Sequence, residues 1–495
     1  MLALTSEQSR EADRRAEDGG LPAAVLRENA GRGAFEILKK YFPDLSQKKI
    51  LVVCGKGNNG GDGRVVARLL EGVAGEVRVI DVGAWRAMPL HEYDILIDAI
   101  FGTGLSRPVE GVAKEAIEAM NRSGKWKMAL DVPSGLSADT GEPLGALPKG
   151  TTGVAVKADV TVTMGRPKIG LLQPQAAPYV GRLEVVDIGI PASVYDSLGS
   201  RIQWVTGADI RPLFTRRGAD THKGTYGHVL LIGGSETKPG AILLAGKSAL
   251  RTGAGLATVA LPDRAFRKLP KNFLELMYEP LPSVRSGTFA RKAWAKIARA
   301  LEGKSAVAMG PGMGVNADTR ELVRRMILKA GQPLVLDADA LNCLGPVGAR
   351  RAVPLRRNVI LTPHPGEMAR LTGLTTAKIQ KDRLAAARDF AMKHGVIVVL
   401  KGFRTVTAAP SGDLFVNATG NPGMATAGMG DVLTGVIVSL LAQGLDAGKA
   451  AVAGVFLHGR AGDRVADRLG DRGLLASEVA DEVPKAIQEM LPCKE

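Results

Sequence analysis

A glycine-dense segment that ends on one carboxylate is the part of the sequence whose residue types best fit a chemical role. It covers residues 417–431 and is followed at once by an apolar stretch, 432–441. Glycines let backbone N–H groups crowd around an anion, and a helix that begins where the segment ends adds its positive pole. Asp431 would lie where phosphate oxygens gather, which suits a base that deprotonates an attacking hydroxyl. A tight turn capped by Asp431 is the alternative for a lone GxGD motif, but it explains the composition of the whole segment less well.

A second group of candidate residues lies in the first half of the chain, where apolar stretches end. Residues 55–63 form a Gly/Asn-rich segment, expected as a loop, after the strand-like stretch 49–54. Its paired asparagines suit a hydroxylated ligand or a cation that prefers neutral oxygen, although Asn and Gly also share ordinary turns. Asp98 and Asp131 each end a strand-like stretch. Such carboxylates serve as acid–base or cation-binding groups, or they cap a following helix.

Two successive patterns of alternating strands and helices must position these residues. Strand-like stretches occur at 49–54, 77–80, 95–98, 128–131, 160–163 and 183–186, and again at 228–234, 306–310, 334–337, 359–362 and 396–400. Alternation at these lengths predicts right-handed crossovers, mostly parallel sheets and ligands bound at the carboxyl ends of the strands. The expected fold class is therefore α/β with two domains. The polar stretch 204–223, rich in Gly and Pro, predicts a boundary near residue 211, which gives domains 1–211 and 212–495.

Composition and charge narrow the class of protein. A chain of 495 residues is too long for one core, and an aromatic content of 4% argues against stacking platforms for single-stranded nucleic acid. The longest apolar stretches are too short and too interrupted to span a bilayer. The net charge of +15 lies in the second part, because residues 1–211 hold 26 basic and 26 acidic side chains and residues 212–495 hold 39 and 24. A nucleotide-type ligand, or simply a solvated basic surface, explains this excess without a nucleic-acid partner.

Cysteine usage and the N-terminus bear on the compartment. The three cysteines lie far apart in the sequence with no CxxC pair, and the first residues contain neither a basic region nor a long apolar core. A reducing cytoplasm is therefore the expected location.

Several ordered motifs resemble those of two known enzyme families. In the first half, residues 58–63 (NNGGDG), 98–105 (DAIFGTGL) and 131–136 (DVPSGL) resemble the signature loops of the NAD(P)H-hydrate epimerase domain. In the second half, residues 310–314 (GPGMG), 362–368 (TPHPGEM), 401–405 (KGFRT) and 417–431 resemble NAD(P)H-hydrate dehydratase. Both halves in this order are similar to the bifunctional bacterial NAD(P)H-hydrate repair enzymes. The resemblance implies a Rossmann-like three-layer αβα sandwich followed by a ribokinase-like αβα domain.

The resemblance to the epimerase implies a substrate in which water has added across the C5–C6 double bond of NADH or NADPH, giving NADHX or NADPHX. The R and S hydrates would interconvert at C6, with Asp131 as the catalytic residue against the ring. Asn59, Asp98 and Ser134 would hold a potassium ion. The residues implied to line the hydrate are Asn58, Asn59, Gly60, Gly61, Asp62, Gly102, Thr103, Gly104, Leu105, Ser106, Arg107, Pro108 and Asp131.

The resemblance to the dehydratase implies removal of water from the S hydrate at the expense of ADP, used with Mg²⁺, giving AMP and phosphate. Asp431 would be the base that lets the C6 hydroxyl take a phosphoryl group. The implied hydrate-binding residues are Ala241, Gly314, His364, Pro365, Gly366, Glu367, Met368, Ala369, Arg370 and Asp431. The implied nucleotide-binding residues are Lys401, Gly402, Phe403, Arg404, Thr405, Asn421, Pro422, Gly423, Met424, Ala425, Thr426, Ala427, Gly428, Met429 and Gly430.

Other interpretations remain open at this point. His364, in a Thr-Pro-His-Pro turn, is either a ligand-facing or a structural histidine, and Asp337 and Asp339 are candidates for assisting Mg²⁺ through water. The second half could also be a ribokinase-type small-molecule kinase fused to a non-catalytic ligand-binding domain. The expected partners are NADHX, NADPHX, ADP and further copies of the chain, with no membrane and no nucleic acid.

Overall fold

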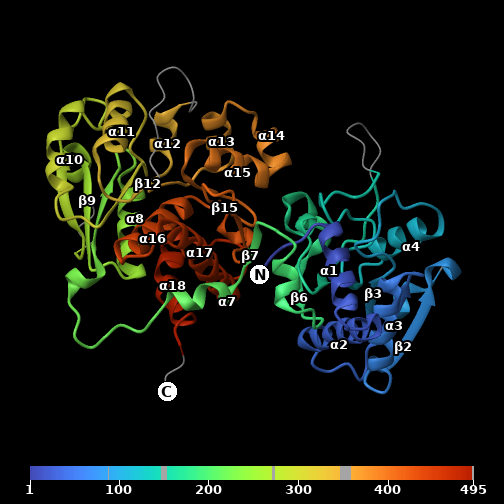
Figure 1. Ribbon diagram of the computed structural model, residues 1–495. Helices are drawn as coiled ribbons and strands as arrows, with labels where there is room; N and C mark the ends of the chain where they lie inside the picture. Colours follow the sequence, from blue (N-terminus) through green and yellow to red (C-terminus); the bar gives the residue numbers. More distant parts are fainter. Residues whose placement is uncertain (87, 146–152, 270–273, 346–357, 493–495) are drawn as a thin grey trace. The chain divides into compact units, whose positions relative to one another are not determined.

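Two compact units make up the chain, Met1–Ile202 and Gln203–Glu495, which are described separately here (Figure 1). The computed structural model describes residues 1–86, 88–145, 153–269, 274–345 and 358–492. The sequence predicts a boundary near residue 211, whereas the units divide earlier. The reason is strand β7 (Ile202–Val205), which adds to the edge of the second unit's sheet and buries Trp204 and Val205 there.

The first unit is built on a six-stranded sheet in the order β2-β1-β3-β4-β5-β6, and every pairing in it is parallel. Its strands are β1 (Lys49–Cys54), β2 (Glu76–Asp81), β3 (Ile95–Ala99), β4 (Trp126–Leu130), β5 (Val160–Met164) and β6 (Arg182–Val186). Its helices are α1 (Ser6–Asp18), α2 (Ala23–Tyr41), α3 (Asn58–Leu70), α4 (Gly111–Arg122), α5 (Ala177–Val180) and α6 (Ala192–Asp196).

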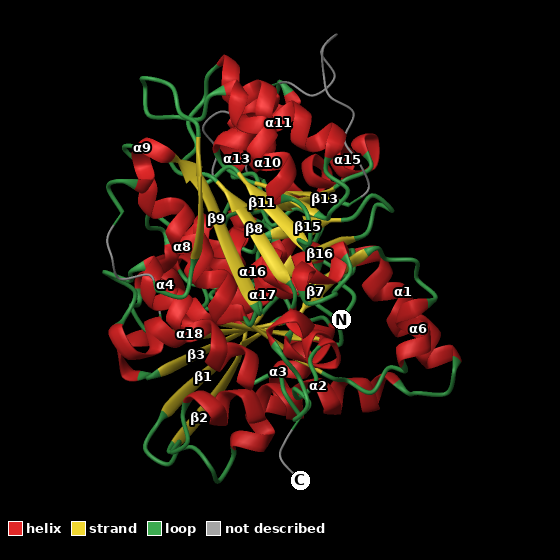
Figure 2. Ribbon diagram, turned by 90° about the vertical axis from the view of Figure 1, so that its left-hand side faces the viewer, coloured by secondary structure: helices red, strands yellow, loops and turns green. Residues whose placement is uncertain are grey.

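Each face of this sheet carries its own apolar core. In β1, Ile50 and Val52 pack with buried residues of α1, α2 and α3, while Leu51 and Val53 pack with buried residues of α4. Successive side chains of a strand point to opposite faces, so a strand covered on both sides is apolar along its whole length. This arrangement is the predicted three-layer αβα sandwich, seen in Figure 2 as yellow strands flanked by red helices.

The second unit contains a ten-stranded sheet in the order β10-β9-β8-β11-β12-β13-β14-β15-β16-β7. Its further strands are β8 (His228–Ile232), β9 (Leu256–Pro262), β10 (Met277–Leu281), β11 (Ala306–Met309), β12 (Leu334–Leu336), β13 (Val359–Leu361), β14 (Ile397–Leu400), β15 (Val406–Ala408) and β16 (Leu414–Asn417). Pairing is parallel from β10 to β14 and antiparallel at β14–β15 and β15–β16.

Helices cover both faces of the second sheet (Figure 1). On one face, α8 (Pro239–Thr252), α16 (Met429–Ala442), α17 (Ala447–Leu469) and α18 (Ala476–Gln488) share an apolar core with the strands. The remaining helices are α7 (Gly207–Ile210), α9 (Asp263–Phe266), α10 (Trp294–Ala300), α11 (Ala317–Lys329), α12 (Asp339–Leu344), α13 (Pro365–Thr372), α14 (Thr376–Lys381) and α15 (Arg383–His394). The parallel strands thus bring their carboxyl ends, where the candidate residues lie, to one edge.

Two further findings concern the described residues alone. None of their helices combines the length and the apolar content needed to cross a membrane. Cys54 and Cys343 are buried free thiols, while Cys493 lies outside the described residues.

Candidate active sites

Within the Gly/Asn-rich segment after β1, residues 58–63 form the first turns of α3, where the sequence predicts a loop. Glycines permit this close approach: a Cβ on Gly60 would lie 1.9 Å from the carbonyl oxygen of Gly55, and one on Gly63 would lie 2.5 Å from the Cβ of Ala99. Because residues three apart share a helix face, Asn59 and Asp62 lie on the same side of α3. The helical start therefore places an amide and a carboxyl group at one edge of the sheet.

Asp131 lies directly after β4, in a strained backbone conformation. Its φ of 63° is in the left-handed region, which residues other than glycine rarely adopt. Its Oδ2 accepts a hydrogen bond from the Thr103 amide at 3.1 Å, and a Cβ on Gly102 would come within 2.9 Å of the same oxygen. Glycine at position 102 thus lets the loop after β3 close over the Asp131 carboxylate.

Lys168 holds the other oxygen of Asp131. Its Nζ donates to Asp131 Oδ1 at 2.5 Å, to the carbonyl oxygen of Met164 at 2.9 Å and to Thr163 Oγ1 at 3.2 Å, and the residue is 1% exposed. Burial alone would raise the pKa of Asp131, but the Lys168 ammonium and its hydrogen bond, with amide donors, bring that pKa below its usual value. Asp131 is therefore an ionised carboxylate near neutral pH.

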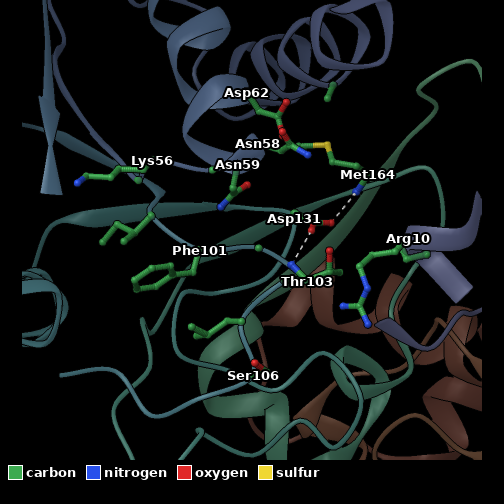
Figure 3. Close-up of a pocket in the computed structure, with 18 of the residues that line it drawn as sticks. Arg10, Lys56, Asn58, Asn59, Asp62, Phe101, Thr103, Ser106, Asp131 and Met164 are labelled. Carbon is green, nitrogen blue, oxygen red and sulfur yellow. Dashed lines mark hydrogen bonds between the residues drawn. The ribbon is translucent and has the colours of Figure 1, made fainter. Parts of the chain in front are cut away.

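A cavity of about 1010 Å³ opens onto these residues (Figure 3). This volume is at the upper end of the range for small-molecule binding sites, so the cavity can hold a ligand as large as a dinucleotide. The lining includes most of the residues implied to contact the hydrate, joined by side chains from α1 and α2: Arg10, Asp13, Arg27, Asn58, Asn59, Asp62, Gly102, Thr103, Gly104, Leu105, Ser106, Arg107, Pro108, Asp131 and Lys168. Gly60 and Gly61 are not in this lining; they support it as part of α3.

Two further carboxyl groups face the same cavity as Asp131. Burial, followed by the negative charge of Asp131, raises the pKa of Asp62 to about 8. Burial also raises the pKa of Asp13, on α1, to about 6, against the opposing effect of Lys168. The cavity therefore combines one fixed carboxylate with carboxyl groups that hold a proton closer to neutral pH.

Asp98 and Ser134 form a buried hydrogen-bonded pair. Asp98 Oδ1 accepts from Ser134 Oγ at 2.5 Å and Oδ2 accepts from the Ser134 amide at 2.8 Å. Burial raises the pKa of Asp98 to about 6. Both side-chain polar atoms of Asn59 are buried without a hydrogen-bond partner among the described residues. A buried amide in this condition indicates a place for a ligand or a cation.

In the second unit, Asp431 lies in the first turn of α16, after the glycine-rich segment. Gly428 begins that turn with a φ of 90°, and a Cβ on Gly430 would be 3.2 Å from the Lys401 ammonium. The helix N-terminus, the ammonium group and the carboxylate thus lie close together. This combination suits a phosphoryl group in transfer.

Lys401, however, pairs with Asp337 rather than with Asp431. Its Nζ is 2.7 Å from Asp337 Oδ1 and 3.9 Å from Glu367 Oε2. Asp337 also accepts hydrogen bonds from Thr362 Oγ1 at 2.7 Å and Thr434 Oγ1 at 2.9 Å, which fixes it at the end of β12. The Asp337 side chain is therefore buried, with three donors around it.

The pKa of Asp431 is raised to about 7, chiefly by burial and then by the charge of Asp337, against the lowering effect of Lys401. A carboxylate with a pKa close to the working pH is well matched to general-base catalysis, since it is both available and basic. A carboxyl group with a pKa near neutral thus lies at the position where the sequence predicts a base.

Residues 364–370 point in different directions because they form the N-cap and first turns of α13. His364 Nδ1 accepts from the amide of Gly366 at 3.0 Å, and the His364 amide donates to Glu367 Oε2 at 2.8 Å. His364 therefore has a structural capping role while its ring stays half exposed. Met368 is completely buried, and Arg370 donates to Asn342 on α12.

The turn between β14 and β15, residues 401–405, is held by the buried guanidinium of Arg383. Arg383, 2% exposed, donates to the carbonyl oxygens of Phe403 at 2.7 Å, Leu400 at 2.7 Å and Lys401 at 3.1 Å. Gly402 lies against this group, since a Cβ on Gly402 would be 3.1 Å from the Arg383 guanidinium.

On the glycine-rich segment, Asn421 Nδ2 donates to Asp463 Oδ1 at 2.9 Å, which ties the segment to α17. The tip, Ala425 to Ala427, is exposed.

Two remaining positions lie near β11. Ala241, on α8, faces Gly312, whose would-be Cβ lies 3.1 Å from the Ala241 side chain. The Gly314 amide donates to Asp339 Oδ2 at 2.9 Å.

Comparison with known proteins agrees with both halves of the resemblance. Residues 229–485 match the family model described as NAD(P)H-hydrate dehydratase, and residues 23–89 and 83–170 match that of the YjeF-related protein N-terminus. A bifunctional NAD(P)H-hydrate repair enzyme from Moorella thermoacetica is 39% identical, covering 99% of this chain and 97% of its own. This chain belongs to the bifunctional NAD(P)H-hydrate repair enzyme family. An Escherichia coli member is 33% identical, covering 97% of this chain and 93% of its own.

Solved structures resemble the dehydratase half of this family member. An ADP/ATP-dependent NAD(P)H-hydrate dehydratase from Bacillus subtilis, co-crystallised with ATP and Mg²⁺, is 34% identical with a TM-score of 0.50 and covers 58% of this chain and 98% of its own. A ribokinase-like superfamily protein from Enterococcus faecalis is 26% identical with a TM-score of 0.52 and covers 59% of this chain and 96% of its own. The predicted ribokinase-like fold is confirmed.

Three groups at the two sites of this repair enzyme were not found from its sequence. Lys168 follows the end of β5 by four residues, so the rule that ligands gather at strand carboxyl ends could have indicated it. Asp13 belongs to no recognisable motif, and it lines the cavity because α1 packs against this part of the unit. His458, on α17, has a buried Nε2 without a partner among the described residues, and burial lowers its pKa to about 4.

Proposed function

We propose that this protein repairs hydrated NADH and NADPH, with the first unit interconverting the R and S hydrates at C6 and the second dehydrating the S hydrate at the expense of ADP. The observation that supports this most is that each unit gathers its own set of site residues at the carboxyl edge of its own sheet. The proposal further rests on relatives that match nearly the whole chain under one bifunctional description.

In the epimerase unit, residues of the first turns of α3 and of the loop after β3 would hold the hydrate in the cavity. C6 carries both a hydroxyl group and the ring nitrogen, so loss of the hydroxyl as water leaves a cation that the nitrogen stabilises. Asp131, ionised beside Lys168, would face this cation and lower the free energy of the transition state that leads to it. Water would then add to either face of C6.

Potassium at Asn59, Asp98 and Ser134 is consistent with the groups found there. The unpartnered amide oxygen of Asn59 and the buried carboxylate of Asp98 are oxygen donors that a weakly hydrated monovalent cation would satisfy. When bound, the ion would offset the cost of burying Asp98 and would hold the loops after β3 and β4 near the hydrate.

In the dehydratase unit, Asp431 would take the proton of the C6 hydroxyl as that oxygen attacks the terminal phosphorus of ADP. AMP leaves, and C6 then carries phosphate, which is a much better leaving group than hydroxide. Loss of this phosphate and of a proton from C5 restores the C5–C6 double bond. The amides at Gly428 to Gly430 and the Lys401 ammonium would stabilise the charge on the transferring phosphoryl group.

Mg²⁺ is expected to arrive with the nucleotide rather than at a preformed protein site. The described residues contain no group of three or more His, Cys, Asp or Glu side chains placed to hold a metal. Mg²⁺ keeps much of its hydration shell and is commonly bound by phosphates with one or two carboxylates, and it would neutralise charge on the phosphates of ADP. Asp337 and Asp339, at the end of β12, are the nearest candidates for contacts through water.

We assign the nucleotide to the turn 401–405 and to residues 421–430, and the hydrate to Ala241, Gly314 and residues 364–370 with Asp431. Arg383 would support the nucleotide turn from within the fold. Assembly into a homo-oligomer and a cytoplasmic location remain predictions.

The deciding experiment supplies purified protein with a mixture of R and S hydrate and either ADP or ATP. We expect reduced-nicotinamide absorbance to return completely, because epimerisation feeds the R hydrate into dehydration. Accumulation of a stable phosphorylated product would instead indicate a small-molecule kinase. That alternative is not favoured, since the curated relatives match both halves.

A further inference from the structure

The proton that epimerisation requires must have a carrier, and the surroundings of Asp131 make it unsuitable for that task. Four donors point at its carboxylate: the Lys168 ammonium, the amides of Thr103 and Met164, and the Thr163 hydroxyl. A protonated Asp131 would lose the charge-assisted bond to Lys168 and would find no acceptor among these partners except Thr163. Its surroundings therefore stabilise the carboxylate form.

The side chain of Lys168 is held in place as firmly as that of Asp131. Its three N–H donors are matched by three acceptors: Asp131 Oδ1, Thr163 Oγ1 and the Met164 carbonyl oxygen. All three donors of Lys168 are therefore used within the protein, and none is left to face the hydrate.

Asp62 occupies a different position in the same cavity. Figure 3 shows it on the side of α3, across from the strand-end loop that carries Asp131. The charged groups that face it are Asp131, Asp13 on α1, Arg27 on α2 and Lys168. Unlike Asp131, it makes no ion pair among the described residues, so it can change its protonation state without breaking one.

We propose that Asp62 is the proton carrier of the epimerase, while Asp131, held by Lys168, acts only as a fixed negative charge facing the ring. This assignment rests on the epimerase function proposed above. The raised pKa of Asp62, about 8, agrees with it because the carboxyl group is then protonated at neutral pH.

The proton and electron balance is closed by Asp62 and water alone. The Asp62 carboxyl group gives its proton to the C6 hydroxyl, the C6–O bond breaks with its electron pair on oxygen, and water leaves. The lone pair of the ring nitrogen forms the C6–N double bond. A water molecule then attacks C6, the π electrons return to nitrogen, and the released proton returns to Asp62, through solvent when attack is on the far face. No oxidant, reductant or second substrate is needed.

The test follows R hydrate converting to S hydrate by chromatography on the full-length protein without ADP, so that dehydration does not draw on the product. Asp62→Asn is expected to lower the epimerisation rate by about 10²–10⁴ while R hydrate still binds by calorimetry. The wild-type rate is expected to fall as the pH rises above about 8, where Asp62 loses its proton.

Asp13→Asn is the comparison variant, since Asp13 is a second, largely buried carboxyl group that lines the same cavity as Asp62. In this variant the alkaline limb should move to lower pH, because the Asp13 charge raises the pKa of Asp62. Full activity of Asp62→Asn, a larger loss for Asp13→Asn, or a wild-type profile without an alkaline limb would each overturn the assignment. A wild-type protein that does not interconvert the hydrates would instead refute the proposed function itself.

Discussion

Each unit of this protein places a lysine near an aspartate of its candidate site, but the two units pair them differently. In the first, Lys168 bonds directly to Asp131 at 2.5 Å, and the pKa of Asp131 is lowered. In the second, Lys401 bonds to Asp337 at 2.7 Å, and the pKa of the neighbouring Asp431 is raised to about 7. The same residue types thus give a carboxyl group of lowered pKa in one unit and one of near-neutral pKa in the other. The choice of partner, rather than the presence of lysine, determines the chemistry available.

The largest effect is expected from Asp431→Asn, which removes the proposed base from the second unit. Because an amide cannot take the proton of the C6 hydroxyl, return of reduced-nicotinamide absorbance should fall by about 10²–10⁴. The Gly428 to Gly430 amides and Lys401 remain, so ADP should still bind, and more tightly with one negative charge removed near its phosphates. A coupled absorbance assay and calorimetry on the same preparation measure both.

The first unit is the internal control for this variant, since R and S hydrate should continue to equilibrate. If ADP binding is lost together with turnover, Asp431 builds the nucleotide site rather than acting as base. Retained turnover would exclude it from the reaction altogether.

A smaller effect is expected from pH. Asp431 must be ionised to act as a base, so dehydration of S hydrate should fall about tenfold for each pH unit below about 7. Asp131 stays ionised in that range, since its pKa is lowered, and epimerisation should therefore keep its rate under the same acidification. Initial rates of each reaction across the pH range compare the two units within one protein.

Asp337→Asn tests the cause of the difference. The charge of Asp337 raises the pKa of Asp431, so its removal should move the acid limb of dehydration to lower pH and leave Lys401 free to pair with Asp431. The second site would then resemble the first. An unmoved acid limb would show that Asp337 does not control the base.

The positions of the strand ends can be predicted from the sequence, whereas the lysine–aspartate ion pairs cannot. The stretches that form β1, β3 and β11 are short and apolar throughout, as expected for strands buried on both faces of a sheet. The residues that follow them could therefore be placed at the carboxyl ends of strands. The bond between Asp131 and Lys168 joins residues 37 positions apart. It depends on the left-handed backbone of Asp131 and on how β4 and β5 pair, which single-residue types do not encode.

The loop predicted at the glycine-rich residues 58–63 is wrong for a related reason. Asn58 to Gly63 is poor in helix-favouring residues, so a loop was expected, yet α3 begins at Asn58. Close packing explains the helix, because Gly60 and Gly63 lie where a side chain would collide with Gly55 and Ala99. Tertiary packing overrides propensity here, and it brings Asn59 and Asp62 to one face.

Potassium should affect the first unit by a smaller, several-fold amount. Replacing K⁺ with Li⁺, which holds its water more tightly, should slow epimerisation and lower the melting temperature of that unit, because Asn59 and Asp98 would lose the proposed cation. Thermal melts and epimerisation rates in matched chloride salts measure the change. In Asn59→Ala the response should disappear; a wild-type protein indifferent to the cation would remove the proposed site.

The smallest effect on catalysis is expected from separating the units, because their site residues do not interleave in the sequence. A fragment of residues 203–495 should dehydrate S hydrate at the full-length rate, and residues 1–202 should interconvert the hydrates. A fragment that begins at residue 212 lacks β7 and α7, so it loses Trp204 and Val205, which are 6% and 2% exposed, and the hydrogen bond from the Ala418 amide to Val205.

Burial of those two side chains contributes about 3–6 kcal/mol, so the shorter fragment should unfold at markedly lower denaturant concentration than residues 203–495. Denaturation curves of the two fragments, with dehydration rates measured well below their transitions, separate stability from catalysis. Equal stability would mean that β7 is dispensable to the second sheet. If residues 203–495 fold but consume S hydrate only when residues 1–202 are added, the two sites are not independent. The contrast between the two lysine–aspartate arrangements would then belong to one shared reaction centre.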